Sequence, residues 1–256
     1  MKRIIDLRVA EEPRRFAGRY ALLTLTPTSA EPLPYADAGA FVQVAANEPG
    51  VFLRRPISVC DIDETSNALR LLIRDAGAAT HRLVNAHEGD VFNVVMPLGH
   101  GFTVDIAPGT RVLLAGGGVG VAPLLRLGKL LKAKGVEPVF VQGARSKADL
   151  LLTEEFAALG RLEITTDDGS FGVKGVVTDH AVFAEAFDFI YCCGPSPMMK
   201  AVARVARERG IEAEVSLENM MACGLGACLC CVEKTVKGNV CVCKEGPVFN
   251  IKELTW

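Results

Sequence analysis

The first hundred residues alternate short apolar runs with polar turns. Apolar runs occupy residues 19–26, 41–44, 68–74 and 91–95, and parts of them place a hydrophobic residue at every second position. Proline, glycine and acidic residues separate the runs. Partial period-two alternation that is interrupted this often is typical of antiparallel strands. The pattern therefore predicts an antiparallel β-barrel or sandwich over residues 1–104.

The pattern changes near residue 111. A buried strand is predicted at 111–115 and a helix at 121–134, with further strands at 138–142 and 189–193. Strands that alternate with helices predict a parallel α/β domain, here over residues 105–213. The remaining segment, 214–256, is too short for a core of its own, and we expect a bound metal cluster to organise it. The predicted fold is thus multi-domain: a β-barrel, an α/β parallel-sheet domain and a small C-terminal domain.

Composition narrows the possible functions. The chain has 256 residues, half of them hydrophobic, and a net charge of −2. Lysine and arginine are scattered without a basic stripe, so we expect no nucleic-acid partner. The most apolar stretch, 112–125, is too short and glycine-rich to span a bilayer, and charges interrupt the N-terminal residues. We expect a cytoplasmic protein without a membrane segment or an export signal.

Six of the nine cysteines lie between residues 223 and 243. Cys223, Cys228, Cys231 and Cys243 have the plant-type ferredoxin spacing for one [2Fe–2S] cluster. Gly224 would let the intervening backbone curl around such a cluster. A cluster of this kind carries single electrons, which predicts an electron-transfer protein.

A zinc site is the alternative. Cys228, Cys231, Cys241 and Cys243 could form a four-thiolate zinc centre. Zinc would leave Cys223 and the glycine turn without a role, so the spacing favours iron–sulfur. Cys230 is also surplus, and either Cys230 or Cys241 could replace a ligand.

Two loops are suited to a nucleotide. The turn with Gly116, Gly117, Gly118 and Gly120 leads from a strand into a helix N-terminus, where free amides favour a pyrophosphate. The turn is not Gly-x-Gly-x-x-Gly, and alone it could be a tight strand–helix connection. A second strand enters a similar turn at 193–195, that is Cys193, Gly194 and Pro195. Turns at the carboxyl ends of parallel strands frame the crevice where open α/β sheets bind ligands.

These loops resemble the pyridine-nucleotide loops of the ferredoxin reductase superfamily. Upstream, Arg55-Pro56-Ile57-Ser58 resembles its flavin signature. The resemblance implies FAD, with Arg55 on a phosphate and Ser58 facing the isoalloxazine ring. It also implies a nicotinamide site beside Cys193. Further flavin contacts are implied for Leu72, Ile73, Arg74, Ala79 and Thr80, although the superfamily usually has glycine where Ala79 stands.

The order of the segments resembles the electron-transfer subunits of class 1B dihydroorotate dehydrogenases. Residues 167–172, 218–228 and 243–249 carry further matching text. This resemblance implies an NAD-linked oxidoreductase subunit of pyrimidine biosynthesis, paired with an FMN-containing catalytic subunit in a heterotetramer. Electrons would pass from FMN through [2Fe–2S] and FAD to NAD⁺, with no catalytic acid or base in this chain. Cys243 is preferred over Cys241 because it directly precedes Lys-Glu-Gly-Pro-Val-Phe.

Two other functions stay open. The chain could be the small flavin and [2Fe–2S] subunit of an NADH-dependent ferredoxin:NADP oxidoreductase or sulfide dehydrogenase. It could also be a zinc-stabilised interaction module. Arg145, after the second strand of the α/β domain, would suit an NADP 2′-phosphate, although the resemblance favours NAD. We further expect the apolar tail, 248–256, to pack on the catalytic subunit.

Overall fold

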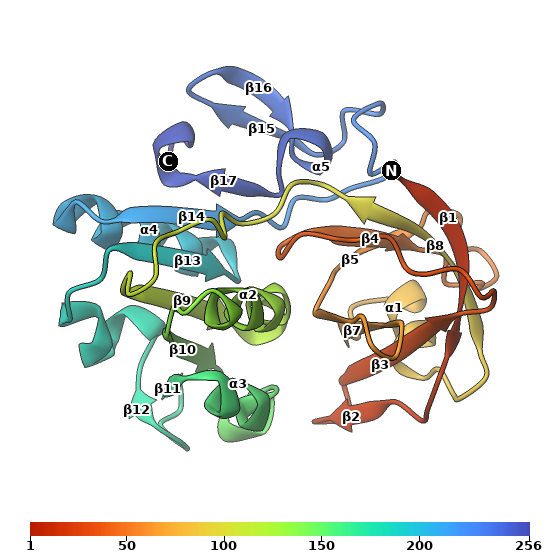
Figure 1. Ribbon diagram of the computed structural model, residues 1–256, viewed down its shortest axis with the longest axis horizontal. Coiled ribbons are helices and arrows are strands. Elements are labelled where there is room, and N and C mark those ends of the chain that lie inside the picture. Colours follow the sequence, from red (N-terminus) through yellow and green to blue (C-terminus); the bar gives the residue numbers. More distant parts are fainter.

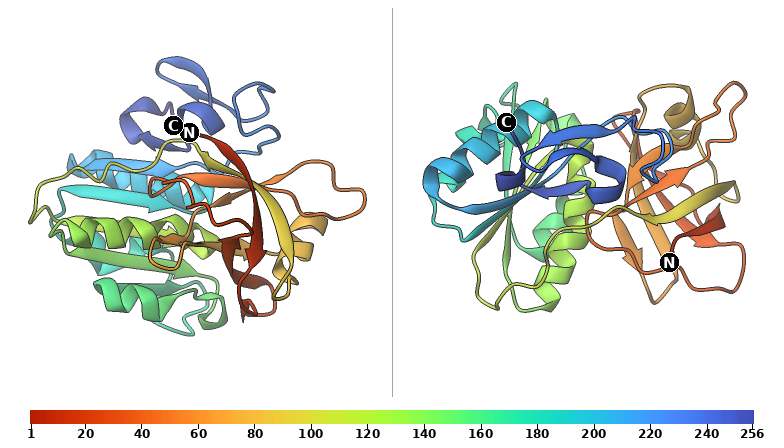
Figure 2. Two further views of the ribbon diagram at one scale, coloured as in Figure 1. Left: turned by 45° about the vertical axis from the view of Figure 1, so that its right-hand side comes forward. Right: turned by 90° about the horizontal axis from the view of Figure 1, so that it is seen from above.

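The computed structural model describes residues 1–256 as two units that lie side by side, with the C-terminal segment above both (Figure 1). Residues 1–98 form the β unit, and the α/β unit follows a connection that ends near residue 111. Both termini lie on the side of the C-terminal segment (Figure 2). The domain limits at 104 and 213 stay predictions. The second limit falls within β14, which runs from Glu212 to Ser216.

The β unit is one antiparallel sheet with strand order β5-β4-β8-β1-β3-β7-β6, and β2 pairs with β3. Alternate positions face the interior, where Leu23, Leu71 and Phe92 form a core. The antiparallel β architecture predicted as a barrel or sandwich is confirmed, and the sheet takes the form of a half-barrel. Its elements are β1 (Arg3–Val9), β2 (Arg14–Phe16), β3 (Tyr20–Pro27), β4 (Phe41–Val44), β5 (Arg55–Ser58), β6 (Asp61–Asp63), β7 (Ala68–Arg74), α1 (Ala78–Val84) and β8 (Val91–Leu98).

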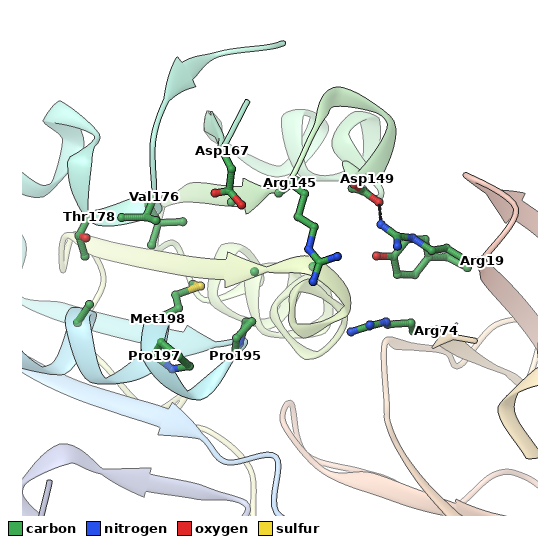
Figure 3. Close-up of a pocket in the computed structure, with 17 residues that line it drawn as sticks. Arg19, Arg74, Arg145, Asp149, Asp167, Val176, Thr178, Pro195, Pro197 and Met198 are labelled. Carbon is green, nitrogen blue, oxygen red and sulfur yellow. Dashed lines mark hydrogen bonds and ion pairs between the residues drawn. The ribbon is translucent and has the colours of Figure 1, made fainter. Parts of the chain in front are cut away.

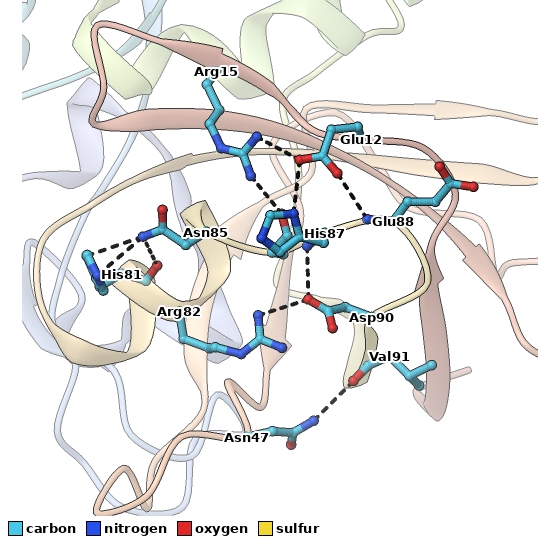
Figure 4. Close-up of polar contacts among 11 residues, drawn as sticks. Glu12, Arg15, Asn47, His81, Arg82, Asn85, His87, Glu88, Asp90 and Val91 are labelled. Carbon is cyan, nitrogen blue, oxygen red and sulfur yellow. Dashed lines mark hydrogen bonds and ion pairs between the residues drawn. The ribbon is translucent and has the colours of Figure 1, made fainter.

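A polar network joins α1 to the sheet (Figure 4). The Arg82 guanidinium donates to the Asp90 carboxylate at 3.0 Å, and the His87 amide donates to the same carboxylate at 2.9 Å. The Arg82 side chain first, and the His87 amide after it, lower the pKa of Asp90 against the opposing effect of burial. Glu12 in turn accepts from Arg15 at 2.8 Å. These contacts hold α1 and the turn before β8 in place.

The α/β unit is a sheet of order β12-β11-β10-β9-β13-β14-β17. Leu114 and Phe140 face α2 and α3, whereas Leu113 and Val141 face α4, so helices cover both surfaces. The elements are β9 (Val112–Gly117), η1 (Gly118–Val121), α2 (Ala122–Ala133), β10 (Pro138–Ala144), η2 (Lys147–Asp149), α3 (Thr153–Leu159), β11 (Arg161–Thr166), β12 (Val173–Lys174), η3 (Val177–Asp179), η4 (Ala181–Ala184), β13 (Phe189–Cys193), α4 (Ser196–Arg209) and β14 (Glu212–Ser216).

The C-terminal segment has no separate core. Its hairpin, β15 (Val232–Thr235) and β16 (Gly238–Cys241), is followed by α5 (Val242–Glu245), β17 (Val248–Asn250) and η5 (Ile251–Glu253). Strand β17 pairs antiparallel with β14 and completes the α/β sheet. Phe249, Ile251 and Leu254 are at most 5% exposed because they pack into the α/β core. The expectation that these tail side chains pack on a partner is therefore wrong.

Candidate functional site

A cavity of about 330 Å³ lies between the β unit and the α/β unit, and we call it the flavin crevice. Its walls come from β4, β5 and β7 on one side and from the carboxyl ends of β13 and β14 on the other. Arg74 is shared with a second cavity. Among the predicted flavin residues, the crevice is lined by Pro56, Ile57, Ser58, Leu72, Ile73, Arg74 and also Cys193. Apolar walls with a few polar groups, among them the Ser58 and Ser216 hydroxyls and the Arg74 guanidinium, fit a flavin ring system.

The second cavity, of about 350 Å³, lies over the carboxyl ends of β9, β10 and β13, and we call it the nucleotide cavity. Gly117, Gly118 and Pro195 line it, as predicted residues of the two loops. Figure 3 shows Arg145 and Arg74 directed into the cavity. These two guanidinium groups suit the phosphates of a dinucleotide.

The nucleotide cavity also contains residues that sequence reasoning missed. Arg19, next to β3, reaches across to the Asp149 carboxylate on η2, which fixes one end of the cavity (Figure 3). These residues are 130 positions apart, so no local signal joins them. Asp167, directly after β11, also lines the cavity. Its neighbour Asp168 has the turn role, because its carboxylate accepts from the Ser170 amide at 2.9 Å.

The other glycines of the two loops hold the loops together. A Cβ on Gly120 would lie 2.6 Å from the Cys193 carbonyl oxygen, and one on Gly194 would lie 3.1 Å from the Gly117 nitrogen. Gly116 leaves space for Val121 in the same way. None of the three lines a cavity, so their observed role is close backbone packing.

Cys193 lies on the α/β wall of the flavin crevice and is 2% exposed. Burial, and after it the Glu218 carboxylate, raise the pKa of Cys193 well above its usual range. Glu218 lines the crevice as well, and its side chain is partly accessible to solvent. Surrounding protein atoms remove water from its carboxyl group and raise its pKa, whereas the nearby Arg74 guanidinium lowers it by a smaller amount. Cys193 is therefore a neutral thiol that shapes the crevice.

Three predicted flavin residues lie outside both cavities. Arg55 donates to the Leu53 carbonyl at 2.8 Å, and Thr80 accepts from the Ala76 amide at 2.8 Å. Ala79 is buried in the first turn of α1 and has no positive φ, so its backbone does not require the glycine of the superfamily. Their flavin contacts stay predictions.

The cysteine loop curls through two glycines with positive φ, Gly224 at 69° and Gly226 at 82°. Its amides point at sulfur: Leu225 donates to Cys223 Sγ at 3.3 Å and Gly226 to Cys243 Sγ at 3.1 Å. Burial raises the pKa of the Cys223 thiol, but backbone amides outweigh it and lower the value to about 6. Amides aimed at thiolates are typical of iron–sulfur loops, as expected from the sequence.

The predicted ligands form two pairs. Cys228 lies within hydrogen-bonding reach of Cys223, and Cys231 within reach of Cys243. No group of three or more His, Cys, Asp or Glu side chains is placed to hold a single ion. Zinc requires four ligands around one ion, whereas a [2Fe–2S] cluster takes two thiolates on each of two irons. Two pairs of thiols match this ligand set of a [2Fe–2S] cluster.

The fold and these sites define the chain as a flavin- and pyridine-nucleotide-dependent oxidoreductase of the ferredoxin-reductase fold with an iron–sulfur domain. Residues 218–255 match the iron–sulfur cluster binding domain of dihydroorotate dehydrogenase B, and residues 114–204 match the oxidoreductase NAD-binding domain. The chain belongs to the family of electron transfer subunits of dihydroorotate dehydrogenase B (NAD(+)).

Curated relatives have the name of this family, and solved structures share the fold. The subunit of this name from Geobacillus thermodenitrificans is 43% identical, over 85% of this chain and 86% of the relative. The one from Bacillus caldolyticus is 40% identical, over 94% of this chain and 95% of the relative. A structure of an NADH-dependent reduced ferredoxin-NADP oxidoreductase has a TM-score of 0.87 and 34% identity, over 98% of this chain and 90% of that chain. Phthalate dioxygenase reductase, at 19% identity and a TM-score of 0.67, shares the fold.

Proposed function

We propose that this chain conducts electrons from an FMN-containing dihydroorotate dehydrogenase catalytic subunit to NAD⁺ in pyrimidine biosynthesis. The observation that carries the proposal is the order of the three sites. The crevice and the nucleotide cavity share Arg74, and the crevice wall continues through Asn219 and Met221 into the cysteine loop. When bound, [2Fe–2S] supplies single-electron transfer, FAD exchanges single electrons and pairs, and NAD⁺ takes a pair.

The residues of the chain bind and orient the groups. The paired thiols of Cys223 and Cys228, and of Cys231 and Cys243, would hold the cluster, with amides of the loop directed at sulfur. Ser58 and the apolar walls would hold the flavin ring, and Arg145 the phosphates of NAD. No side chain is required as an acid or base on a substrate, since proton chemistry would occur in the catalytic subunit.

We also propose a docking surface for the catalytic subunit, at the cysteine loop instead of the tail. Leu225 is 49% exposed, Leu229 65% and Met220 83%, all within or beside the loop. Apolar side chains that lie open beside cluster ligands mark the place where electrons enter most directly. Leu229 has a positive φ of 60°, which aspartate tolerates, so Leu229→Asp adds a charge without new backbone strain.

We expect Leu229→Asp to weaken binding to the catalytic subunit by at least about tenfold, because a buried unpaired charge is strongly unfavourable. Val236→Asp is the matched control, since Val236 is 64% exposed on the β15–β16 hairpin. Size-exclusion chromatography and titration calorimetry with the catalytic subunit measure the effect. Equal binding by both variants and the wild type would place the interface elsewhere.

The chain has none of the helices that a membrane crossing requires. All nine cysteines are free thiols. A loop of accessible thiols that must receive iron is suited to a reducing compartment. We propose that the chain functions in the cytoplasm.

An anaerobic visible spectrum of the chain mixed with the catalytic subunit tests the proposed function. We expect dihydroorotate to bleach both FAD and cluster bands in the mixture, and neither when one protein is omitted. If dihydroorotate has no effect while NADH still bleaches FAD, the result would favour the small subunit of a ferredoxin:NADP oxidoreductase or a sulfide dehydrogenase. The structural relative at 34% identity, an NADH-dependent reduced ferredoxin-NADP oxidoreductase, supports this second candidate function.

A further inference from the structure

Gln43 is a polar side chain in an otherwise apolar strand. It lies on β4, and 1% of its surface is exposed. Its neighbours Val42 and Val44 point into the core of the half-barrel, so Gln43 points the other way, toward the C-terminal segment. Its Oε1 has no hydrogen-bond partner. Burying an amide oxygen without a partner is unfavourable, which calls for a reason beyond packing.

The side chain touches the cysteine loop on both sides of Cys223. Its Nε2 donates to the Ala222 carbonyl at 3.4 Å. A Cβ built on Gly224 would lie 2.9 Å from both Cγ and Nε2 of Gln43, so the loop backbone is pressed against the amide. Cys223, which carries the first thiolate of the loop, is therefore held between two contacts with a side chain of the β unit.

The strand that carries Gln43 also borders the flavin crevice. Gln43 pairs with Pro56 on β5, and Pro56 lines the crevice. Phe41, two residues earlier on β4, lines it as well. One short strand pair thus has flavin-site residues and a residue in contact with the cysteine loop.

We propose that Gln43 is a positioning residue, which fixes Cys223 and the amides that follow it in the loop relative to the flavin crevice. The inference rests on the proposed function only in that the chain holds FAD and the cluster. Donors near a cluster stabilise its reduced, more negative form. Without the Gln43 amide, the loop amides that donate to Cys223 Sγ and Cys243 Sγ would shift, which lowers the reduction potential, and the spacing between the two electron carriers would loosen.

The test uses the full chain loaded with FAD and cluster, without the catalytic subunit, so that its result is independent of dihydroorotate. In Gln43→Leu we expect iron, sulfide and FAD contents to match the wild type. The midpoint potential of the cluster should fall by about 59 mV, the equivalent of a tenfold shift for one electron. The g-values of the reduced cluster should change, and electron transfer from NADH-reduced flavin to the cluster should slow about tenfold, since positioning errors cost rate.

Gln142→Leu is the matched control. Gln142 is 3% exposed, its Nε2 has no partner, and it lies on β10 away from the cysteine loop. It should leave the potential and the g-values unchanged. If Gln43→Leu does not fold, Gln43→Met keeps the length of the side chain without the amide and should give the same spectral change. Wild-type potential, g-values and transfer rate in the folded variant would overturn the proposal.

Discussion

The packing of the two nucleotide loops gives a sharp prediction for Gly120→Ala. The added Cβ would lie 2.6 Å from the Cys193 carbonyl oxygen and 2.7 Å from the Gly194 Cα. Ordinary contacts begin at 3.4 Å, so the loops must separate by about 0.8 Å. Both neighbours are backbone atoms, which cannot move aside by a change of rotamer.

The energetic effect follows from the overlap. Overpacking of this kind costs about 1–3 kcal/mol. If that strain is relieved by opening the turn that holds the nucleotide, NADH binds about fivefold to 150-fold more weakly. The methyl group does not touch the cysteine loop, so the iron content should stay at the wild-type value. The FAD content is measured alongside, because Cys193 also lines the flavin crevice.

Anaerobic stopped-flow reduction of bound FAD over a range of NADH concentrations measures the affinity. Gly210→Ala is the control: Gly210 ends α4 with a φ of 66° and has open space around it. This control should lose about 1 kcal/mol of stability through backbone strain and keep its NADH affinity. An NADH affinity of Gly120→Ala within twofold of the wild type would refute the argument that the two loops must touch.

Three further changes test the site and the fold. Cys243→Ser should lose the cluster and Cys241→Ser should keep it, as iron and sulfide analysis would show; the reverse result would exchange the assigned ligand. Asp167→Asn should raise the kcat/KM ratio of NADPH to NADH about tenfold, because the carboxylate no longer repels a 2′-phosphate; an unchanged ratio would remove Asp167 from cofactor selection. The lowered pKa of Asp90 means that its contacts stabilise the fold above the unfolded-state pKa, near 3.8, and that this is lost as the pH falls through the folded-state pKa. In urea unfolding, Asp90→Asn should have a free energy of unfolding lower than that of the wild type by about 1 kcal/mol or less at pH 7, and equal to it in acid. A difference that does not change with pH would contradict this prediction.

Sequence reasoning succeeded where the signal is local. The strand at 68–74 and the helix after Gly120 were predicted because side-chain periodicity follows backbone geometry directly. The spacing of the cysteines identified a loop whose amides do point at sulfur. Two cysteines separated by only two residues, such as Cys228 and Cys231, constrain the backbone in the same way in any protein.

The failures concern contacts between distant segments. The tail at 248–250 has the composition of a docking surface, yet it forms β17, because the edge of β14 offers unpaired backbone groups that no sequence window shows. Arg19 was missed since Asp149, its partner across the nucleotide cavity, lies in another unit. Gln43 looked like one polar residue in an apolar strand until the cysteine loop was seen against it.

The pairing of β17 with β14 has a consequence for how the chain is made. Because β17 follows β14 in the chain and closes the edge of the α/β sheet, a nascent chain that has not yet reached Val248 exposes the backbone of β14. An open edge is a template for pairing with other chains. Truncation upstream of Val248 would thus leave an aggregation-prone intermediate, and synthesis of β17 protects the nucleotide-binding unit from self-association.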